Sequence, residues 1–345
     1  MILFAVPSFS QRLLPVLQLT RMALVFTALA DSGCALMLWA KDQVRLNRGV
    51  LWHELDPTQC IALAFVSIGL YGFGMSLNDI IDRRRDRQMS PNRPLPSGRI
   101  GVRTAHVVCA LLALLALFGG ETYSNVAPNA GLSLWLVVFT GALIVFYDFA
   151  AKYLVPLGLL SLGFIRFFHA AIAAPNLPVL WHPLLLMNHV TIVSTLAYYW
   201  EHKRPALRRR HFWSVVAGLT AFDLLAIGTF WWRWHNSRAA FPGGALGIRP
   251  ALLAPALAAV AFIVLAVWIR RRSANSRAAG QALMLTGLMW LIVYDASFVV
   301  AFVGLPEGIM ILMLLPVTYA AVIVMRWWGR MILLSQRPEF KRVET

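Results

Sequence analysis

Three aspartates and an asparagine end a long apolar stretch, and their spacing is the strongest chemical signal in the chain. Asp79, Asp82 and Asp86 lie three and four residues apart, so a helix continuing from the apolar run 61–77 places them, with Asn78, within an arc of about 100°. Like charges so close together repel each other unless a cation lies between them. Because ligand sets made only of oxygen favour a hard ion, the pattern predicts Mg²⁺ rather than Zn²⁺.

The distance between the outer aspartates limits how a metal can bind. Asp79 and Asp86 lie about 10 Å apart along a helix axis, too far for one ion to contact both on a straight helix. Three arrangements are open: the helix breaks, the acids hold more than one ion, or a bound anion fills the gap. Arginines within and after the motif suit a polyanionic ligand such as diphosphate: Arg83, Arg84, Arg85, Arg87 and Arg93.

The acidic motif is followed by Arg-Pro-Leu-Pro-Ser-Gly at residues 93–98. Asn-Asp-x-x-Asp-x-x-x-Asp with this hexapeptide resembles the first motif of the UbiA-type membrane prenyltransferases. The resemblance is close over residues 71–104, continues as a helix pattern to about residue 205 and is weak beyond. It implies a helical membrane enzyme that binds an isoprenyl diphosphate through Mg²⁺ and transfers the prenyl group to a hydrophobic acceptor. The three aspartates would then be metal ligands and catalytic residues.

Composition independently predicts an all-α, polytopic transmembrane helix bundle. Of 345 residues, 59% are hydrophobic and only 13% are charged, and the apolar residues fall into long blocks. Ten blocks approach the roughly 20 residues that a bilayer requires. They lie at 16–40, 58–81, 103–120, 131–148, 154–174, 181–200, 212–233, 251–270, 279–303 and 307–328. Because no stretch between them is long enough to fold alone, residues 1–345 are predicted to form one membrane-embedded domain.

Basic residues cluster in alternate loops, which predicts the orientation in the membrane. If both termini and the loop after Asp86 share one side, that side carries 23 Lys and Arg residues against 6 on the other. The excess predicts that the motif loops and both termini face the cytoplasm of an inner or plasma membrane. The same clustering accounts for the net charge of +16 without nucleic-acid binding.

Ionisable residues inside membrane spans are costly and mark candidate functional positions. Arg166 lies near the middle of the fifth span, where the resembling family has an arginine that lines the cavity. One interpretation is that Arg166 approaches the donor phosphates or an acidic acceptor, as a catalytic residue. The other is an ion pair that serves packing alone, with Asp31, Asp223 or Asp295 as the partner.

The cysteines and the intramembrane histidines show no metal-binding pattern in the sequence. Cys34, Cys60 and Cys109 lie in or beside apolar runs without ligand spacing, which predicts small buried hydrophobic side chains. His169 and His189 are expected to form hydrogen bonds between helices rather than to bind a metal.

Two further polar groups end spans on the motif side. Tyr147 and Lys152 close the fourth span, where the family often has Tyr-x-x-x-Lys. Lys152 is a candidate for phosphate binding, and Tyr147 either stabilises a prenyl cation through its ring face or belongs to the interfacial tyrosines. The sixth span ends in Glu201-His-Lys203-Arg204, where the family usually carries a second aspartate-rich motif. Lys203 and Arg204 are expected to neutralise phosphate directly, with Glu201 orienting them or ligating a water-rich Mg²⁺.

The residues favour a Mg²⁺-dependent membrane prenyltransferase, with an isoprenyl diphosphate donor and a lipophilic acceptor, aromatic ones included. One alternative is a non-catalytic binder or transporter of a phosphorylated lipid, which would use the same charged helix ends. The other is the same fold acting as a prenyl-diphosphate hydrolase or cyclase. The single carboxylate at the end of the sixth span keeps both alternatives open.

Overall fold

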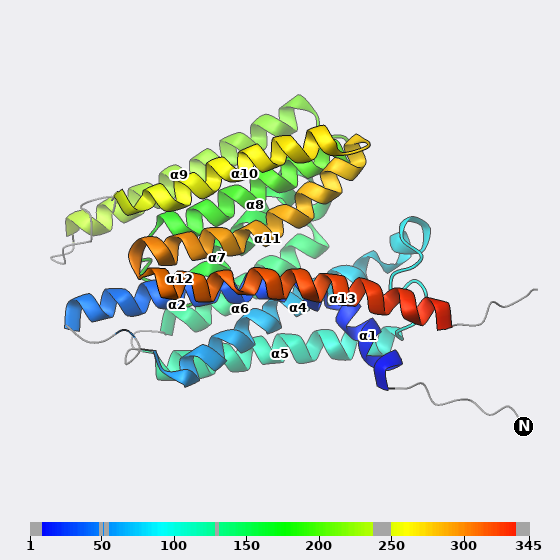
Figure 1. The fold of residues 1–345 in the computed structure, drawn as a ribbon, viewed down its shortest axis with the longest axis horizontal. Coiled ribbons are helices and arrows are strands. Elements are labelled where there is room, and N and C mark those ends of the chain that lie inside the picture. Colours follow the sequence, from blue (N-terminus) through cyan, green and yellow to red (C-terminus); the bar gives the residue numbers. More distant parts are fainter. Residues whose placement is uncertain (1–8, 48–50, 52–54, 128–130, 237–249, 336–345) are drawn as a thin grey trace, which may run out of the picture.

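Long helices make up nearly all of the part of the chain that the computed structural model describes, which is residues 9–47, 51, 55–127, 131–236 and 250–335 (Figure 1). They run along a common axis and are joined mostly by short turns. In chain order they are α1 Phe9–Leu19, η1 Met22–Leu24, α2 Val25–Asn47, α4 Pro57–Met89, α5 Val102–Val126, α6 Gly131–Phe149, η2 Ala151–Tyr153, α7 Val155–Ala171, α8 Trp181–Trp200, α9 Arg209–Asn236, η3 Pro250–Leu252, α10 Leu253–Arg272, α11 Ser276–Phe302, α12 Leu305–Leu312 and α13 Leu314–Ser335.

The predicted all-α membrane bundle is confirmed. Within the described residues, eight helical segments are long and apolar enough to cross a bilayer. The 17-residue apolar helix α7 and the 20-residue α8 run beside them in the bundle. Together these segments correspond to the ten predicted spans.

Three span boundaries differ from the prediction. The first span does not begin at residue 16, because the backbone turns at Arg21 (φ 48°) and α2 starts only at Val25. The last one is divided at Met313 into α12 and α13. In the second, α4 continues past residue 81 to Met89 and reaches about 50 Å. It ends before Pro91, because a residue preceding proline avoids the helical conformation.

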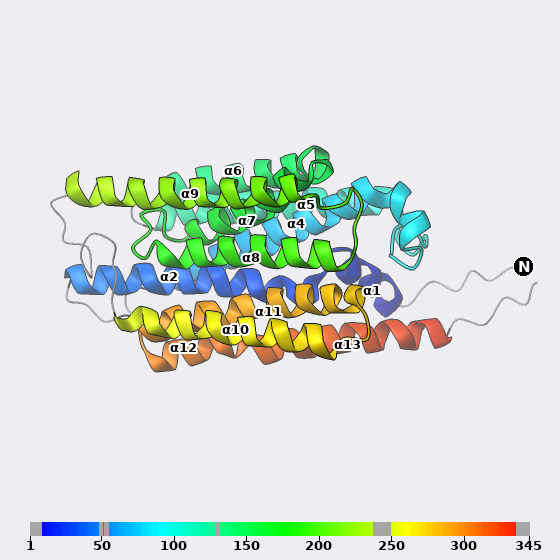
Figure 2. The same cartoon turned by 90° about the horizontal axis from the view of Figure 1, so that it is seen from above.

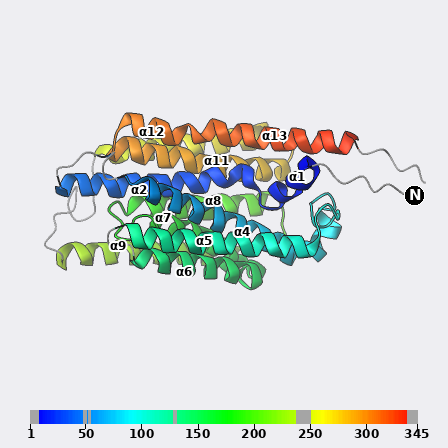
Figure 3. The same ribbon diagram turned by 90° about the horizontal axis from the view of Figure 1, so that it is seen from below.

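Helix α2 lies at the centre of the bundle (Figures 2 and 3). It packs against α4 and α7 on one side and against α11, α12 and α13 on the other. The closest helix pair is α4 with α5, where two glycines replace side chains at the contact. A Cβ atom on Gly69 would lie 2.5 Å from the backbone nitrogen of Ala116, and one on Gly119 would lie 2.6 Å from the carbonyl oxygen of Ala62. Any larger residue at either position would force α4 and α5 apart.

The outward faces of the bundle are apolar and part of its interior is charged. Large side chains such as Leu114, Trp135, Leu224 and Val264 are exposed on α5, α6, α9 and α10, whereas several carboxylates are fully buried. A surface of this kind suits lipid rather than water. The protein is therefore a multi-pass integral membrane protein.

The chain segments nearest the two termini lie at the same end of the bundle as the acidic motif. Figure 1 shows α1, the loop after α4 and the C-terminal part of α13 at one end, and the C-terminal ends of α2 and α9 at the other. The predicted cytoplasmic side therefore corresponds to one physical end of the structure. Residues 1–8 and 336–345 lie outside the described residues.

Single cysteines at the two ends should show opposite accessibility. In a cysteine-free background, Ser90→Cys should react with a membrane-impermeant maleimide only from the cytoplasmic side, and Asn236→Cys only from the outside. The physical reason is the excess of basic residues around the acidic motif. Labelling of both positions from the same side would contradict the ten-span arrangement.

Candidate active site

Helix α4 carries the acidic motif on its inner face without a break. Asp79, Asp82 and Asp86 are 4%, 6% and 3% exposed, whereas Arg84 and Arg87 on the opposite face are exposed. The helix continues to Met89, so the broken-helix arrangement considered for the motif does not occur. Each buried carboxylate consequently needs a positive partner inside the bundle.

Arg93 bridges the two outer aspartates. Its Nη1 lies 2.6 Å from Oδ2 of Asp86 and 3.3 Å from Oδ1 of Asp79. One guanidinium nitrogen therefore contacts both acids across the two turns that separate their Cα atoms, whereas the expectation that a single metal ion cannot contact both on a straight helix stays a prediction. An Mg–O bond is shorter, about 2.0–2.1 Å, so one magnesium ion in this position would draw the carboxylates further together.

The loop at residues 90–101 holds Arg93 in this position. Leu95 and Ile100 are buried against Leu19 of α1, which anchors the loop on the bundle. Gly98 has a φ of 74°, a backbone conformation that glycine adopts at no steric cost, and it reverses the chain. The Arg-Pro-Leu-Pro-Ser-Gly motif thus forms a folded loop that holds its first residue, Arg93, against the acids of α4.

Lys152 holds a second group of oxygen atoms together from the turn η2. Its Nζ lies 2.9 Å from Oδ1 of Asp82, 3.1 Å from Oδ1 of Asn78 and 3.3 Å from Oδ1 of Asp148. Asp148, four residues before Lys152, is 1% exposed and is a fourth carboxylate of the cluster. Tyr147 is half-buried and has Asp148 and Asp82 as charged neighbours.

Arg21 completes the cluster and was not identified from the sequence. Its Nη2 lies 3.5 Å from Oδ1 of Asp79, at the left-handed turn between α1 and η1. Arg85, on the outer side of α4, reaches Oδ2 of Asp82 at 2.7 Å. With Arg93 and Lys152, four basic side chains balance four buried carboxylates. In the sequence, Arg21 is marked only by its charge near the start of an apolar run. The prediction included this residue in the first span.

The oxygen atoms of this cluster fit a hard divalent cation. Three carboxylates of α4 and the amide oxygen of Asn78 face the same buried region, and the two groups around Arg93 and Lys152 adjoin each other along the helix. Magnesium prefers such oxygen ligands and commonly shares them with phosphate. The basic residues that neutralise the acids could then turn to the phosphate oxygens.

The polar end of α8 stays separate from the acids of α4. Glu201 ends α8, and Nζ of Lys203 lies 3.4 Å from its Oε2, while Arg204 is exposed. Both helices end on the same side of the bundle (Figures 1 and 2). Within the described residues, the recorded ion pairs and hydrogen bonds do not join these three residues to the acids of α4.

Arg166 pairs with Asp31, one of the partners considered from the sequence. Its Nε lies 2.6 Å from Oδ2 of Asp31, and its Nη2 donates to Oδ1 at 2.9 Å and to the Thr27 carbonyl at 2.8 Å. Nδ1 of His169 lies 3.3 Å from the same carboxylate. Tyr71 of α4 has both Arg166 and Arg21 as charged neighbours.

The fold and the site together define a polytopic helical membrane protein with a buried cluster of acids and bases at one end of the bundle. Residues 49–292 match the UbiA prenyltransferase family, and the chain belongs to this family. Its fold is similar to a solved structure from a study of digeranylgeranylglyceryl phosphate synthase in membranes. The TM-score is 0.58 at 17% sequence identity, with 85% of this chain and 99% of that chain covered.

Two curated relatives match parts of the sequence. A protoheme IX farnesyltransferase from Acaryochloris marina is 31% identical over 140 residues, which cover 39% of this chain and 40% of that protein. A 4-hydroxybenzoate octaprenyltransferase from Polaromonas sp. is 35% identical over 148 residues, 41% of this chain and 48% of that protein. The matched segments thus span less than half the length of these relatives.

Removing Lys152 should destabilise the protein, because it leaves Asp82 and Asp148 short of a buried cation. Lys152→Met is expected to lower the free energy of unfolding by about 3–5 kcal/mol, measured by denaturant unfolding in detergent micelles. Arg85→Met is the matched control, since Arg85 also pairs with Asp82 but its side chain is 61% exposed. That variant should lose at most about 1 kcal/mol. Equal losses in the two variants would contradict the buried charge balance.

Proposed function

We propose that the protein is a Mg²⁺-dependent prenyltransferase that moves a prenyl group from an isoprenyl diphosphate to a lipophilic acceptor. The observation that carries the proposal is the buried cluster at the end of α4, in which every carboxylate already faces a basic side chain. In such a site the carboxylates can exchange their basic partners for Mg²⁺, and the basic side chains can exchange their carboxylates for diphosphate. The total charge inside the bundle then changes little. Membership of the UbiA prenyltransferase family supports the same reaction class.

The donor headgroup binds where acids and bases interleave. Asp79, Asp82 and Asp86 would hold Mg²⁺, which supplies positive charge for the diphosphate that leaves. Arg93 and Lys152 then release their carboxylates and donate to phosphate oxygens, as charge-assisted contacts. Arg21 lies on the other side of Asp79 and can do the same, with Asn78 orienting the lysine.

The reacting carbon lies deeper, among aromatic side chains. When the allylic C–O bond breaks, the electron pair leaves with the diphosphate and the prenyl group becomes cationic. Tyr71, Phe73 and Tyr147 precede or adjoin the acidic cluster, and their ring faces shield and stabilise such a cation. An acceptor nucleophile forms the new bond and gives up its proton. Arg166, which pairs with Asp31, would meet an acidic acceptor.

A membrane location follows from the donor itself. A long prenyl tail dissolves among the helices and in lipid, while its diphosphate stays at the end of the bundle where basic residues collect. The basic bias of the loops supports a cytoplasmic location for that end.

Turnover tests the proposal directly. Purified protein incubated with Mg²⁺, labelled geranylgeranyl diphosphate and membranes lacking the protein should yield a labelled prenylated lipid. Asp79→Asn and Asp82→Asn should each abolish it, because each removes a charge from the ion site. Arg84→Ala, on the exposed face of the same helix, is the control and should retain activity.

Other outcomes of that assay select the alternatives. Diphosphate release without a prenylated lipid would indicate hydrolysis or cyclisation. Donor binding without any turnover would indicate a binder or transporter. Full Mg²⁺-dependent activity in both aspartate variants would remove the acidic motif from the mechanism.

A second prediction concerns the end of α8, which has one carboxylate and two cations. If Lys203 and Arg204 contact the donor phosphates, the double variant Lys203→Ala/Arg204→Ala should bind prenyl diphosphate about ten- to a hundredfold more weakly. Glu201→Gln should weaken binding less, because it removes only an orienting partner. The exposed pair Arg209 and Arg210 at the start of α9, changed to alanine, is the control. Unchanged donor affinity in the first variant would assign Lys203 and Arg204 to membrane topology alone.

A further inference from the structure

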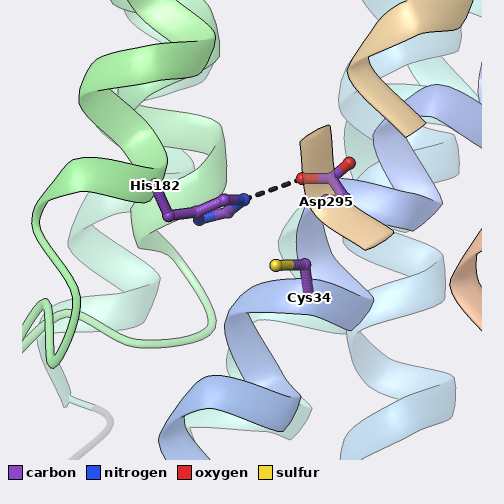
Figure 4. Close-up of side chains that lie close together, drawn as sticks. All are labelled: Cys34, His182 and Asp295. Carbon is purple, nitrogen blue, oxygen red and sulfur yellow. Dashed lines mark hydrogen bonds and ion pairs between the residues drawn. The ribbon is translucent and has the colours of Figure 1, made fainter. Parts of the chain in front are cut away.

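A second polar cluster lies in the opposite half of the bundle from the acidic motif. Cys34 of α2, His182 of α8 and Asp295 of α11 each offer one potential ligand atom, and these atoms all lie within 4.8 Å of one another (Figure 4). Nε2 of His182 lies 2.7 Å from Oδ1 of Asp295. Asp295 is 19 residues into α11, about 28 Å from the end of the bundle where Glu201 lies. The cluster is thus separate from the diphosphate site.

All three side chains are removed from solvent. Cys34 and Asp295 are 0% exposed and His182 is 2% exposed. The second carboxylate oxygen of Asp295, Oδ2, is buried and has no hydrogen-bond partner among the described residues. In Figure 4 this oxygen points away from His182, so Asp295 would offer Oδ1 to an ion bound between the three side chains, and Oδ2 faces away from them.

The charges around the cluster favour a divalent cation. Asp31 and Arg166 are charged neighbours of Asp295, and they already neutralise each other as an ion pair at 2.6 Å. A Cys34 thiolate and the Asp295 carboxylate then carry two negative charges in an apolar region. One divalent ion balances both, whereas without a metal the cluster must hold protons instead.

The ligand types select the metal. A thiolate, an imidazole and a carboxylate together suit zinc, in contrast to the oxygen-only set of α4. Zinc bonds of 2.0–2.3 Å in a tetrahedral site place ligand atoms about 3.3–3.8 Å apart. From its widest separation the cluster needs to close by about 1 Å, whereas Nε2 of His182 and Oδ1 of Asp295, 2.7 Å apart, need to separate by about 0.6 Å; side-chain rotation can provide both changes.

A small cavity borders His182, the one residue of the three proposed ligands that lines it. It has a volume of about 10 Å³, close to that needed by one water molecule, and is lined by His182 together with Ala35, Ala174 and Pro183. Part of its lining comes from the turn between α7 and α8, so the cavity reaches toward the end of the bundle opposite the motif.

We propose that Cys34, His182 and Asp295 bind one Zn²⁺, with water as the fourth ligand, and that the ion ties α2 and α8 to α11. These helices already pack on one another, with α11 in contact with both. The ion is structural: it fixes the helices that flank the ion pair of Asp31 and Arg166. The competing arrangement is a metal-free hydrogen-bonded cluster of a thiol, a histidine and an aspartate.

The metal content of the full-length protein, purified with its affinity tag removed, distinguishes the two arrangements. Mass spectrometry of metals should find about one zinc per chain after desalting. Cys34→Ser and His182→Gln should each lower zinc to background. Cys109→Ser and His189→Gln, which change another buried cysteine and another buried histidine, should retain it. Asp82→Asn should retain it as well, because the acidic motif is a separate site.

Cobalt substitution keeps the test decisive if a variant does not fold. Co²⁺ added to the apo wild-type protein should give a thiolate-to-cobalt charge-transfer band in the near ultraviolet and the visible bands of a tetrahedral ion. Zinc should displace these bands and raise the thermal unfolding temperature. Absence of zinc from wild-type protein together with absence of the charge-transfer band would overturn the proposal, as would equal zinc in wild type and folded Cys34→Ser.

Discussion

Charge neutralisation inside an apolar bundle is the constraint on which the rest of this structure depends. Helix α4 brings three aspartates into a region where an unpaired carboxylate is very costly. The turn at Arg21, the folded loop that carries Arg93 and the turn η2 that carries Lys152 each bring a basic group to these acids. Segments far apart in sequence are therefore organised around one cluster, and this cluster is the proposed magnesium diphosphate site.

In the proposed reaction, such a balanced site would let a polyanion enter the membrane domain. Salt bridges between acids and bases keep the site neutral, and magnesium with diphosphate would replace each partner by another of similar charge. The site is preorganised, because most of its side chains are buried and fixed by two or three contacts each. Preorganised charge is what stabilises a leaving diphosphate without reorganising solvent.

The sequence predicts the parts of this arrangement that are local. Apolar runs of membrane length predict the helices, and acids three and four residues apart predict one helix face, as Asp79, Asp82 and Asp86 show. These predictions are confirmed because the helix period converts spacing directly into position. Phosphate binding by Lys152 stays a prediction, and the structure places Lys152 among the carboxylates.

Contacts between distant segments were beyond such reasoning. Arg21 joins the acids only because a left-handed turn interrupts what the sequence presents as one span. Cys60 was expected to be buried, but it is exposed on the outer surface of α4. The environment outside a membrane bundle is apolar, as its interior is, so an apolar thiol can lie in either. The approach of Cys34 to His182 and Asp295 depends on three helices that meet only in the folded bundle.

Binding of inorganic diphosphate as a function of Mg²⁺ tests the central claim most directly, because it isolates the charged site from acceptor and prenyl chain. Isothermal titration of the purified protein should show diphosphate affinity that rises with Mg²⁺ concentration and is lost in a chelator. Calorimetry in several buffers should show that few protons are exchanged, since bases already held by carboxylates pass to the phosphate. Equal diphosphate affinity with and without Mg²⁺ would contradict the assignment of the α4 acids to a magnesium diphosphate site.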